Sequence, residues 1–95
     1  MNENNQYIAD TYGLEKQLKQ LIEESAELIQ AISKCQRYGC GTVTKRHLFE
    51  EIGDVKLLLD HVIYLMDCEE DVQASINYKI HRELGRINDR RSGKA

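Results

Sequence analysis

The 95-residue chain contains no proline, and this absence constrains its fold more than any other sequence feature. Proline inside a helix removes a backbone hydrogen bond and clashes with the preceding turn, so helices here can run without interruption. Apolar side chains recur every three or four residues in three long stretches, at residues 13–38, 44–66 and 72–87. This spacing is typical of amphipathic helices. We therefore predict a single all-α domain over residues 1–95.

The ends of these helices are predicted from glycine and from capping residues. Two glycines within residues 39–41 interrupt the apolar pattern and indicate a turn between the first two long helices. Thr44 would cap the second helix. Asp67 would cap the third, with Glu70 three residues later completing a capping box.

The flanking segments and the overall arrangement follow from the same pattern. Residues 1–12 are expected to form a short helix, and the polar residues 88–95 are expected to fray. A helix of about 24 residues is roughly 36 Å long, whereas a compact domain of this length has a radius of gyration near ~12 Å. One small monomer would leave such apolar stripes uncovered. We therefore expect an antiparallel helical hairpin plus a C-terminal helix, with a four-helix-bundle core formed on assembly as a homodimer or a tetramer.

Charge and composition exclude several classes of protein. The net charge is −3, and a mildly acidic chain is poorly suited to wrapping a nucleic-acid duplex. No apolar run approaches the ~20 residues that cross a bilayer, and no leader-like segment opens the sequence. The three cysteines are an odd number and too few for a disulfide framework. We predict a cytoplasmic protein with reduced thiols that binds neither nucleic acid nor a membrane.

Acidic residues occur at matched positions on the two helices of the predicted hairpin. Glu24 and Glu27 are three residues apart beside one apolar stripe, and Glu51 and Asp54 repeat that spacing on the next helix. Residues at this spacing are neighbours on a helix surface, and the two pairs are about equally far from the turn. Clustered carboxylates at the edge of a core repel one another and resist desolvation unless a cation neutralises them. Oxygen ligands alone favour Mg²⁺ or Mn²⁺.

The C-terminal segment has the opposite charge. Residues 1–76 carry 14 acidic and 7 basic side chains, whereas residues 77–95 carry two acidic and six basic ones. Lys79, Arg82 and Arg86 follow one edge of the third helix and would suit phosphate oxygens. For Arg86, complementation of the helix dipole explains the charge equally well.

These motifs resemble a known family. The segment EESAE at residues 23–27 followed by EIGD at residues 51–54 resembles the EExxE … ExxD signature of the MazG-type nucleoside triphosphate pyrophosphohydrolases. The lead-in YGLEKQLKQLIEE, starting at Tyr12, and KIHR at residues 79–82 are similar to small members of the same family. The likeness extends over about residues 7–87.

The resemblance implies an all-α oligomer that hydrolyses a (deoxy)nucleoside triphosphate between the α and β phosphates. The implied Mg²⁺ ligands are Glu24, Glu27, Glu51 and Asp54. Glu23 would bind a second metal, support these ligands or orient the attacking water. Lys79 and Arg82 would hold phosphates.

Base selectivity is the point at which the sequence departs from some family members. The turn at residues 39–44 is short and lacks the tryptophans that some of them use to stack a base. The nearby aromatic candidates are Tyr7, Tyr12, Tyr38, Phe49 and His47.

Two other classes of protein remain open. A ferritin-like di-metal protein is also a bundle with inward acids, but it uses Glu-x-x-His pairs. Here His47 precedes Glu50, the wrong order, and neither His61 nor His81 follows a glutamate by three residues. His61 falls near the flank of Asp54 and could line the site. The other class is a non-catalytic dimeric helical module that binds a partner protein and is indifferent to Mg²⁺.

Overall fold

The computed structural model describes residues 1–93, and within these residues all regular structure is helical. Four helices follow one another as α1 (Glu3–Tyr12), α2 (Leu14–Tyr38), α3 (Thr42–Met66) and α4 (Glu69–Arg91). The predicted all-α fold and the short N-terminal helix are therefore confirmed. Residues 88–91, part of the segment expected to fray, continue α4, while residues 94–95 lie outside the described residues.

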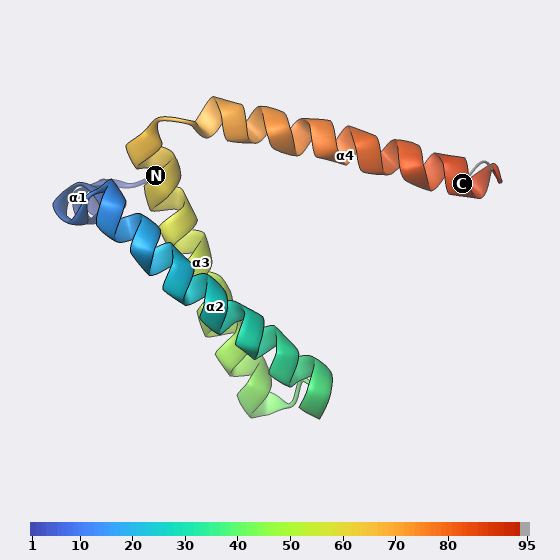
Figure 1. Cartoon of the computed structure of the whole chain (residues 1–95), viewed down its shortest axis with the longest axis horizontal. Coiled ribbons are helices and arrows are strands. Elements are labelled where there is room, and N and C mark those ends of the chain that lie inside the picture. Colours follow the sequence, from blue (N-terminus) through green and yellow to red (C-terminus); the bar gives the residue numbers. More distant parts are fainter. Residues whose placement is uncertain (94–95) are drawn as a thin grey trace.

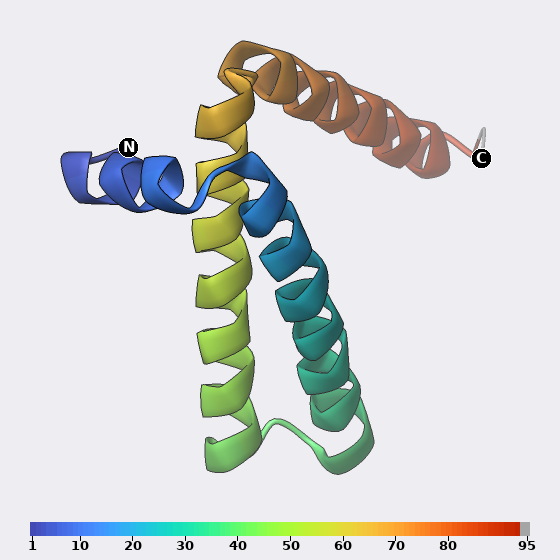
Figure 2. The same cartoon turned by 60° about the vertical axis from the view of Figure 1, so that its left-hand side comes forward.

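Helices α2 and α3 form the predicted antiparallel hairpin (Figure 2). Residues 39–41 connect them, and Gly39 has a φ of 85°, a value that side chains with a Cβ rarely adopt. Gly13, with a φ of 81°, makes the corresponding break between α1 and α2. Each of these glycines donates its backbone N–H to a carbonyl of the preceding helix, to Cys35 and Ala9 respectively. The two breaks in the chain are thus fixed by glycine.

Helix α1 packs across the end of the hairpin that lies away from the turn (Figure 2). Ala9 is fully buried there, and the hydroxyl of Tyr64 on α3 donates a hydrogen bond to Asp10 Oδ2 at 3.0 Å. The short helix therefore adds a third wall to one end of the α2–α3 interface.

Thr44 does not cap α3. The helix begins at Thr42, two residues before Thr44, and Gly41 is its N-cap. The Thr44 hydroxyl donates to the carbonyl oxygens of Gly39 at 2.8 Å and Gly41 at 3.3 Å. A capping side chain would instead accept from a backbone N–H, so Thr44 ties the turn to the first turn of α3.

The capping box predicted at Asp67 and Glu70 is also wrong. Asp67 has a left-handed backbone (φ 50°, ψ 47°) and ends α3. The N–H of Cys68 donates back to the carbonyl of Ile63 at 3.2 Å, a bond typical of helix C-termini that finish in this conformation. Cys68 is the N-cap of α4, without a side-chain capping bond.

Helix α4 leaves the hairpin and runs away from it (Figure 1). Within the described residues it contacts only α3, and none of its side chains is buried. The radius of gyration is 17.3 Å, well above the ~12 Å of a compact domain this size. The single chain therefore leaves the apolar stripe of α4 uncovered, as the sequence predicts, and the predicted oligomer that would cover it stays a prediction.

The interior of the hairpin is unusually polar. Three side chains from each of α2 and α3 are buried, and half of the six are polar. They are Gln17, Ala31, Cys35, Glu51, Leu58 and His61. Buried polar side chains are uncommon unless they are paired or bind a ligand. The hairpin interior is therefore the candidate location of a binding or catalytic site.

Candidate functional site

Three of the predicted carboxylates converge midway along the hairpin. Glu24 of α2 and Glu51 and Asp54 of α3 each offer an oxygen, and these oxygens lie within 4.8 Å of one another. The i, i+3 spacing places Glu51 and Asp54 on one flank of α3, and the antiparallel turn brings Glu24 level with them. The predicted juxtaposition of the two helices' acids is therefore present for these three residues.

The protein supplies hydrogen-bond partners for only some of the carboxylate oxygens in the cluster. Glu51 is 7% exposed, and Oε2 of Glu51 and Oε2 of Glu24 are buried with no hydrogen-bond partner. Gln20 donates to the other Glu24 oxygen at 3.1 Å, and His47 Nε2 lies 3.9 Å from Glu51 Oε1. Buried carboxylate oxygens without partners are costly, so the site favours a cation or a proton.

Both acids of α3 in the cluster hold a proton more tightly than an ordinary carboxyl group. Burial raises the pKa of Glu51, and the nearby Glu27, Glu24 and Asp54 raise it further. Burial also raises the pKa of Asp54, with Glu24 adding to the effect. Desolvation and like charge both disfavour the ionised form. A divalent cation bound at the cluster would offset both the desolvation and the repulsion between the carboxylates.

The two remaining predicted acids differ from each other. Glu27 is exposed and outside the converging group, but it is close enough for its charge to raise the pKa of Glu51. Glu23 is exposed and contributes no oxygen to the group. Glu27 therefore borders the cluster, whereas Glu23 lies on the solvent side of α2.

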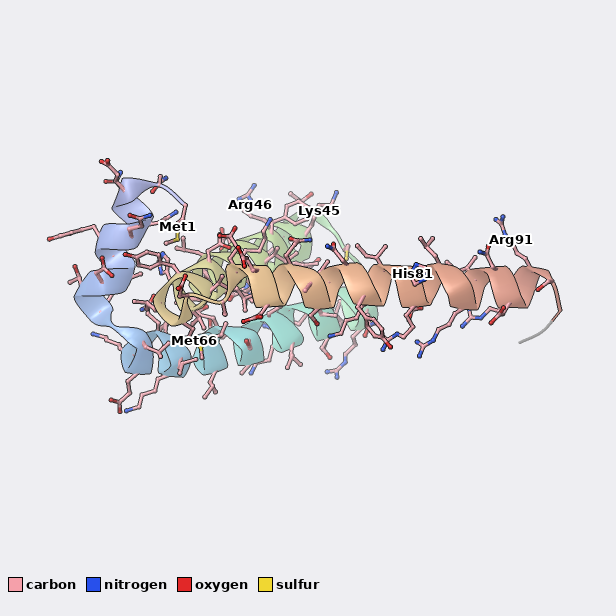
Figure 3. The ribbon with its side chains drawn as sticks, turned by 90° about the horizontal axis from the view of Figure 1, so that it is seen from above. Met1, Lys45, Arg46, Met66, His81 and Arg91 are labelled. Carbon is pink, nitrogen blue, oxygen red and sulfur yellow. The ribbon has the colours of Figure 1, made fainter. Side chains whose placement is uncertain are left out.

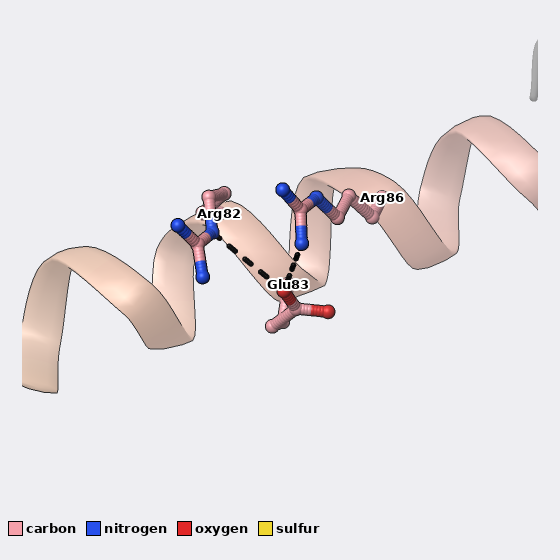
Figure 4. Close-up of polar contacts among 3 residues, drawn as sticks. All are labelled: Arg82, Glu83 and Arg86. Atoms are coloured by element: carbon pink, nitrogen blue, oxygen red, sulfur yellow. Dashed lines mark hydrogen bonds and ion pairs between the residues drawn. The ribbon is translucent and has the colours of Figure 1, made fainter.

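The structure does not bring Lys79 and Arg82 to the carboxylates of the same chain. Both lie exposed on α4, which leads away from the hairpin (Figure 1). Figure 3 shows side chains standing out along α4, with those of His81 and Arg91 labelled. The Arg82 Nε atom is 3.6 Å from Glu83 Oε1, and Arg86 donates to that same oxygen at 2.6 Å (Figure 4). Arg82 and Arg86 thus share one carboxylate on the surface of α4.

One buried polar pair escaped the sequence analysis. His61 Nδ1 and Gln17 Oε1 are 2.7 Å apart, joining α3 to α2. The sequence did place His61 near the flank of Asp54, but gave no sign of Gln17 as its partner. One sequence feature could have indicated Gln17. Gln17 precedes Gln20 by three residues and Gln20 precedes Glu24 by four, so both glutamines lie on the same flank of α2 as Glu24.

The fold and the cluster together define a class of protein. Carboxylate oxygens without thiolate or imidazole ligands suit a hard divalent cation such as Mg²⁺. The donor set and the two buried oxygens without partners fit such an ion. The chain is an all-α protein whose central hairpin carries a carboxylate cluster of the kind that binds a metal.

Comparison with known proteins gives the family. The sequence model of the MazG nucleotide pyrophosphohydrolase domain matches residues 13–92. The chain therefore belongs to the MazG nucleotide pyrophosphohydrolase family. No curated protein and no solved structure matches it. Within the described residues, no helix combines the length and the apolar character needed to span a bilayer.

Proposed function

We propose that the protein hydrolyses a nucleoside or deoxynucleoside triphosphate between the α and β phosphates, giving the monophosphate and pyrophosphate in a Mg²⁺-dependent reaction. The observation that carries this proposal is the convergence of Glu24, Glu51 and Asp54 with buried oxygens left unpaired, in a chain of the MazG family. Displacement at phosphorus depends mainly on positioning and on charge neutralisation, and a carboxylate-held cation suits both.

The metal would be held by Glu24, Glu51 and Asp54, with Glu27 as the fourth carboxylate at the border of the cluster. When bound, Mg²⁺, or Mn²⁺ in its place, polarises phosphoryl oxygens and lowers the pKa of a water molecule. Gln20 orients Glu24 through its amide hydrogen bond. Glu23 directly precedes Glu24 on α2 and is exposed. It would accept a proton from the attacking water or support a second metal.

The phosphates would be held by Lys79 and Arg82 of a second copy of the chain. Within one chain α4 points away from the cluster, so these cations serve a site only if assembly brings α4 of one protomer to the hairpin of another. Arg would contact phosphate oxygens by its planar fork and Lys as a point charge. The proposed active unit is therefore a homodimer or a tetramer.

Uncovered apolar side chains support assembly. On α2, Ile22 is 72% exposed and Ile29 67%. A second apolar stripe runs along α4, where Ile76, Ile80, Leu84 and Ile87 are all between 44% and 56% exposed. Rows of exposed apolar side chains are typical of surfaces that contact another protein. A second copy fits because the carboxylate cluster of the hairpin and the basic end of α4 complement each other in charge.

A cytoplasmic setting is consistent with this role. Cys35, Cys40 and Cys68 are all free, as is usual in a reducing compartment. The substrate is a small nucleotide, and neither a nucleic acid nor a membrane is part of the proposal.

The test is product analysis with a panel of the eight common ribo- and deoxyribonucleoside triphosphates, in Mg²⁺ and in EDTA. The proposal predicts metal-dependent release of pyrophosphate with an equal amount of monophosphate. Release of orthophosphate would contradict cleavage between the α and β phosphates. Silence across the panel, from protein shown to be folded and oligomeric, would favour a non-catalytic interaction module instead.

A further inference from the structure

Two of the three cysteines lie where α2 ends and the hairpin turns, at the end of the hairpin away from α1 (Figure 2). The N–H of Gly39 donates to the carbonyl oxygen of Cys35 at 2.9 Å. When a helix ends in this way, the residue after the glycine commonly packs against the residue whose carbonyl accepts that bond. Here those two residues are Cys40 and Cys35, and their thiols are in hydrogen-bonding contact. The turn therefore holds a pair of thiols rather than two isolated ones.

The two thiols differ in their access to solvent. Cys35 is 8% exposed, and its Sγ lies 3.7 Å from the carbonyl oxygen of Thr44 on α3. Cys40 is exposed. A reagent in solution therefore reaches Cys40 first, and Cys35 is placed to react with Cys40 rather than with the reagent.

The exposed thiol of Cys40 lines a cavity at the tip of the hairpin. This tip cavity has a volume of about 430 Å³ and is lined by Cys40, Gly41, Thr42, Lys45, Arg46 and Phe49. Pockets that bind small organic ligands generally start at about 300 Å³. The volume of the tip cavity therefore suits a molecule of the size of a short peptide, with a thiol and two cations beside it.

The segment that forms the tip of the hairpin is positively charged. Residues 28–49 contain no aspartate or glutamate, although the whole chain has a net charge of −3. The lysine and arginine side chains of this segment are all exposed, and they are Lys34, Arg37, Lys45 and Arg46. A local excess of one charge raises the concentration of oppositely charged small molecules nearby. The tip cavity therefore favours an anion.

The neighbours of Cys40 act on its pKa in opposite directions. The hydrogen bond with the Cys35 thiol raises the pKa of Cys40, desolvation adds to this effect, and the charge of Lys45 opposes it. Thiol–disulfide exchange proceeds through the thiolate. Lys45 is therefore the lining residue that favours attack by Cys40.

We propose that Cys40 and Cys35 form a redox-responsive pair that reacts with a small anionic disulfide bound in the tip cavity. In the first step the Cys40 thiolate attacks one sulfur of the reagent, the S–S bond of the reagent breaks, and one thiol leaves with the proton that Cys40 released. In the second step the Cys35 thiolate attacks the Cys40 sulfur, and the other thiol leaves with the proton of Cys35. The two protein thiols are oxidised to a Cys35–Cys40 disulfide, and the reagent is reduced to two thiols. The modification falls on the turn that joins the two helices of the carboxylate cluster.

Oxidised glutathione, an anionic peptide disulfide, is the probe for the first test. The full-length protein is incubated with it, the remaining thiols are alkylated, and the intact mass and a peptide map are recorded. The wild type is expected to lose two alkylatable thiols, to retain no glutathione, and to show Cys35 linked to Cys40 with Cys68 alkylated. A wild type that keeps all its thiols, that reacts only at Cys68, or that stops at a glutathione adduct would overturn the proposal.

Single serine substitutions separate the two steps. Cys35→Ser is expected to stop at the mixed disulfide between Cys40 and glutathione, whereas Cys40→Ser should leave Cys35 reduced. Cys68→Ser, where α3 meets α4, is the matched control and should form the Cys35–Cys40 disulfide as the wild type does. Reaction of Cys35 with glutathione in Cys40→Ser, as fast as that of Cys40 in Cys35→Ser, would contradict the order of the two steps.

The role of the tip cavity is tested by comparing two disulfides. Arg46→Gln should slow the loss of thiols to oxidised glutathione several-fold, and should have little effect on the reaction with uncharged hydroxyethyl disulfide. Lys56→Gln, an exposed position of α3 about 15 Å further along the helix from Arg46, is the control and should react as the wild type does. An equal effect of Arg46→Gln on both disulfides would show that the cavity does not attract an anion. These measurements need neither metal nor triphosphate, so their outcome is independent of the proposed function.

Discussion

The hairpin of α2 and α3 and the C-terminal helix α4 bury their side chains in opposite ways. The hairpin encloses six side chains, three of which are polar, and it leaves two carboxylate oxygens and one imidazole nitrogen without partners. Helix α4 encloses none and presents an apolar stripe to solvent. The hairpin therefore contains unsatisfied polar groups suited to ligands, whereas α4 contains unsatisfied apolar surface suited to another protein surface.

This difference indicates how such a small chain can support a charged site. Clustered carboxylates destabilise the fold that contains them, and the apolar core of one chain is small. Apolar surface buried on assembly would offset that loss. Substitutions confined to the hairpin or to α4 measure the contribution of each region separately.

The largest expected effect is on turnover, from Glu51→Gln. The substitution keeps the shape of the side chain and removes the charge of a buried ligand, so activity should fall by roughly 100-fold or more. The apo protein should be as stable as the wild type or more stable, since a desolvated charge is lost. Glu50→Gln alters the exposed neighbouring residue and should leave turnover and stability unchanged. Equal activity in the two variants would show that Glu51 is not a ligand.

The next effect is on assembly, from Ile80→Asp on α4. A charge in the middle of an apolar contact is costly to desolvate, so the protein should become monomeric at concentrations where the wild type is oligomeric. Turnover should fall with it, because Lys79 and Arg82 would no longer reach a partner's site. Sedimentation velocity measures the change. Tyr78→Asp, about 200° around the helix from Ile80, is the control, and dissociation by both variants alike would argue against a specific stripe.

A smaller effect is expected from Mg²⁺ on thermal stability. Binding to the folded state alone stabilises it by about 2.7 kcal/mol at a hundred times the Kd, which for a domain of this size raises Tm by roughly 10–20 °C. Circular dichroism melts in EDTA and in millimolar Mg²⁺ give the shift, and Glu51→Gln should reduce it. A wild-type Tm that does not change over the titration would contradict the metal site.

The smallest effect is a pH dependence of the metal-free protein. The folded state holds protons on Glu51 and Asp54 at pH values where the unfolded chain has released them, since burial and like charge raise both pKa values. The free energy of unfolding should therefore fall as the pH rises from the ordinary carboxyl range through the raised pKa values. Melts in EDTA from about pH 5 to about pH 8 measure the slope. Mg²⁺ and Glu51→Gln should each reduce it, and a rising Tm over this range would have the wrong sign.

The sequence predicts the helices well and their ends poorly. The absence of proline and the apolar spacing are local properties, and they determine where the long helices lie. The roles of Thr44 and Asp67 depend on backbone geometry at the turns, where Thr44 donates to carbonyls and Asp67 adopts a left-handed conformation. Either residue is also compatible with an N-cap, so sequence preference alone selected the wrong role.

The candidate site likewise has residues that the sequence predicts and residues that it does not. Glu51 and Asp54 are predictable because their spacing places them on one flank of a helix, and a short turn brings Glu24 level with them. The pairing of His61 with Gln17 joins positions 44 residues apart, and it depends on how each helix is rotated about its axis. The position of α4, which determines what Lys79 and Arg82 can reach, depends on the irregular segment around Asp67.

The central claim is that the carboxylate cluster of the hairpin is a metal site, and Mn²⁺ binding tests it most directly. Free Mn²⁺ gives a strong electron paramagnetic resonance signal that weakens on binding, so a titration counts sites and yields a Kd. The account predicts saturable binding to the wild type and to Glu50→Gln, with binding lost or greatly weakened in Glu51→Gln. Equal binding by all three proteins, or no saturable binding by the wild type, would contradict it.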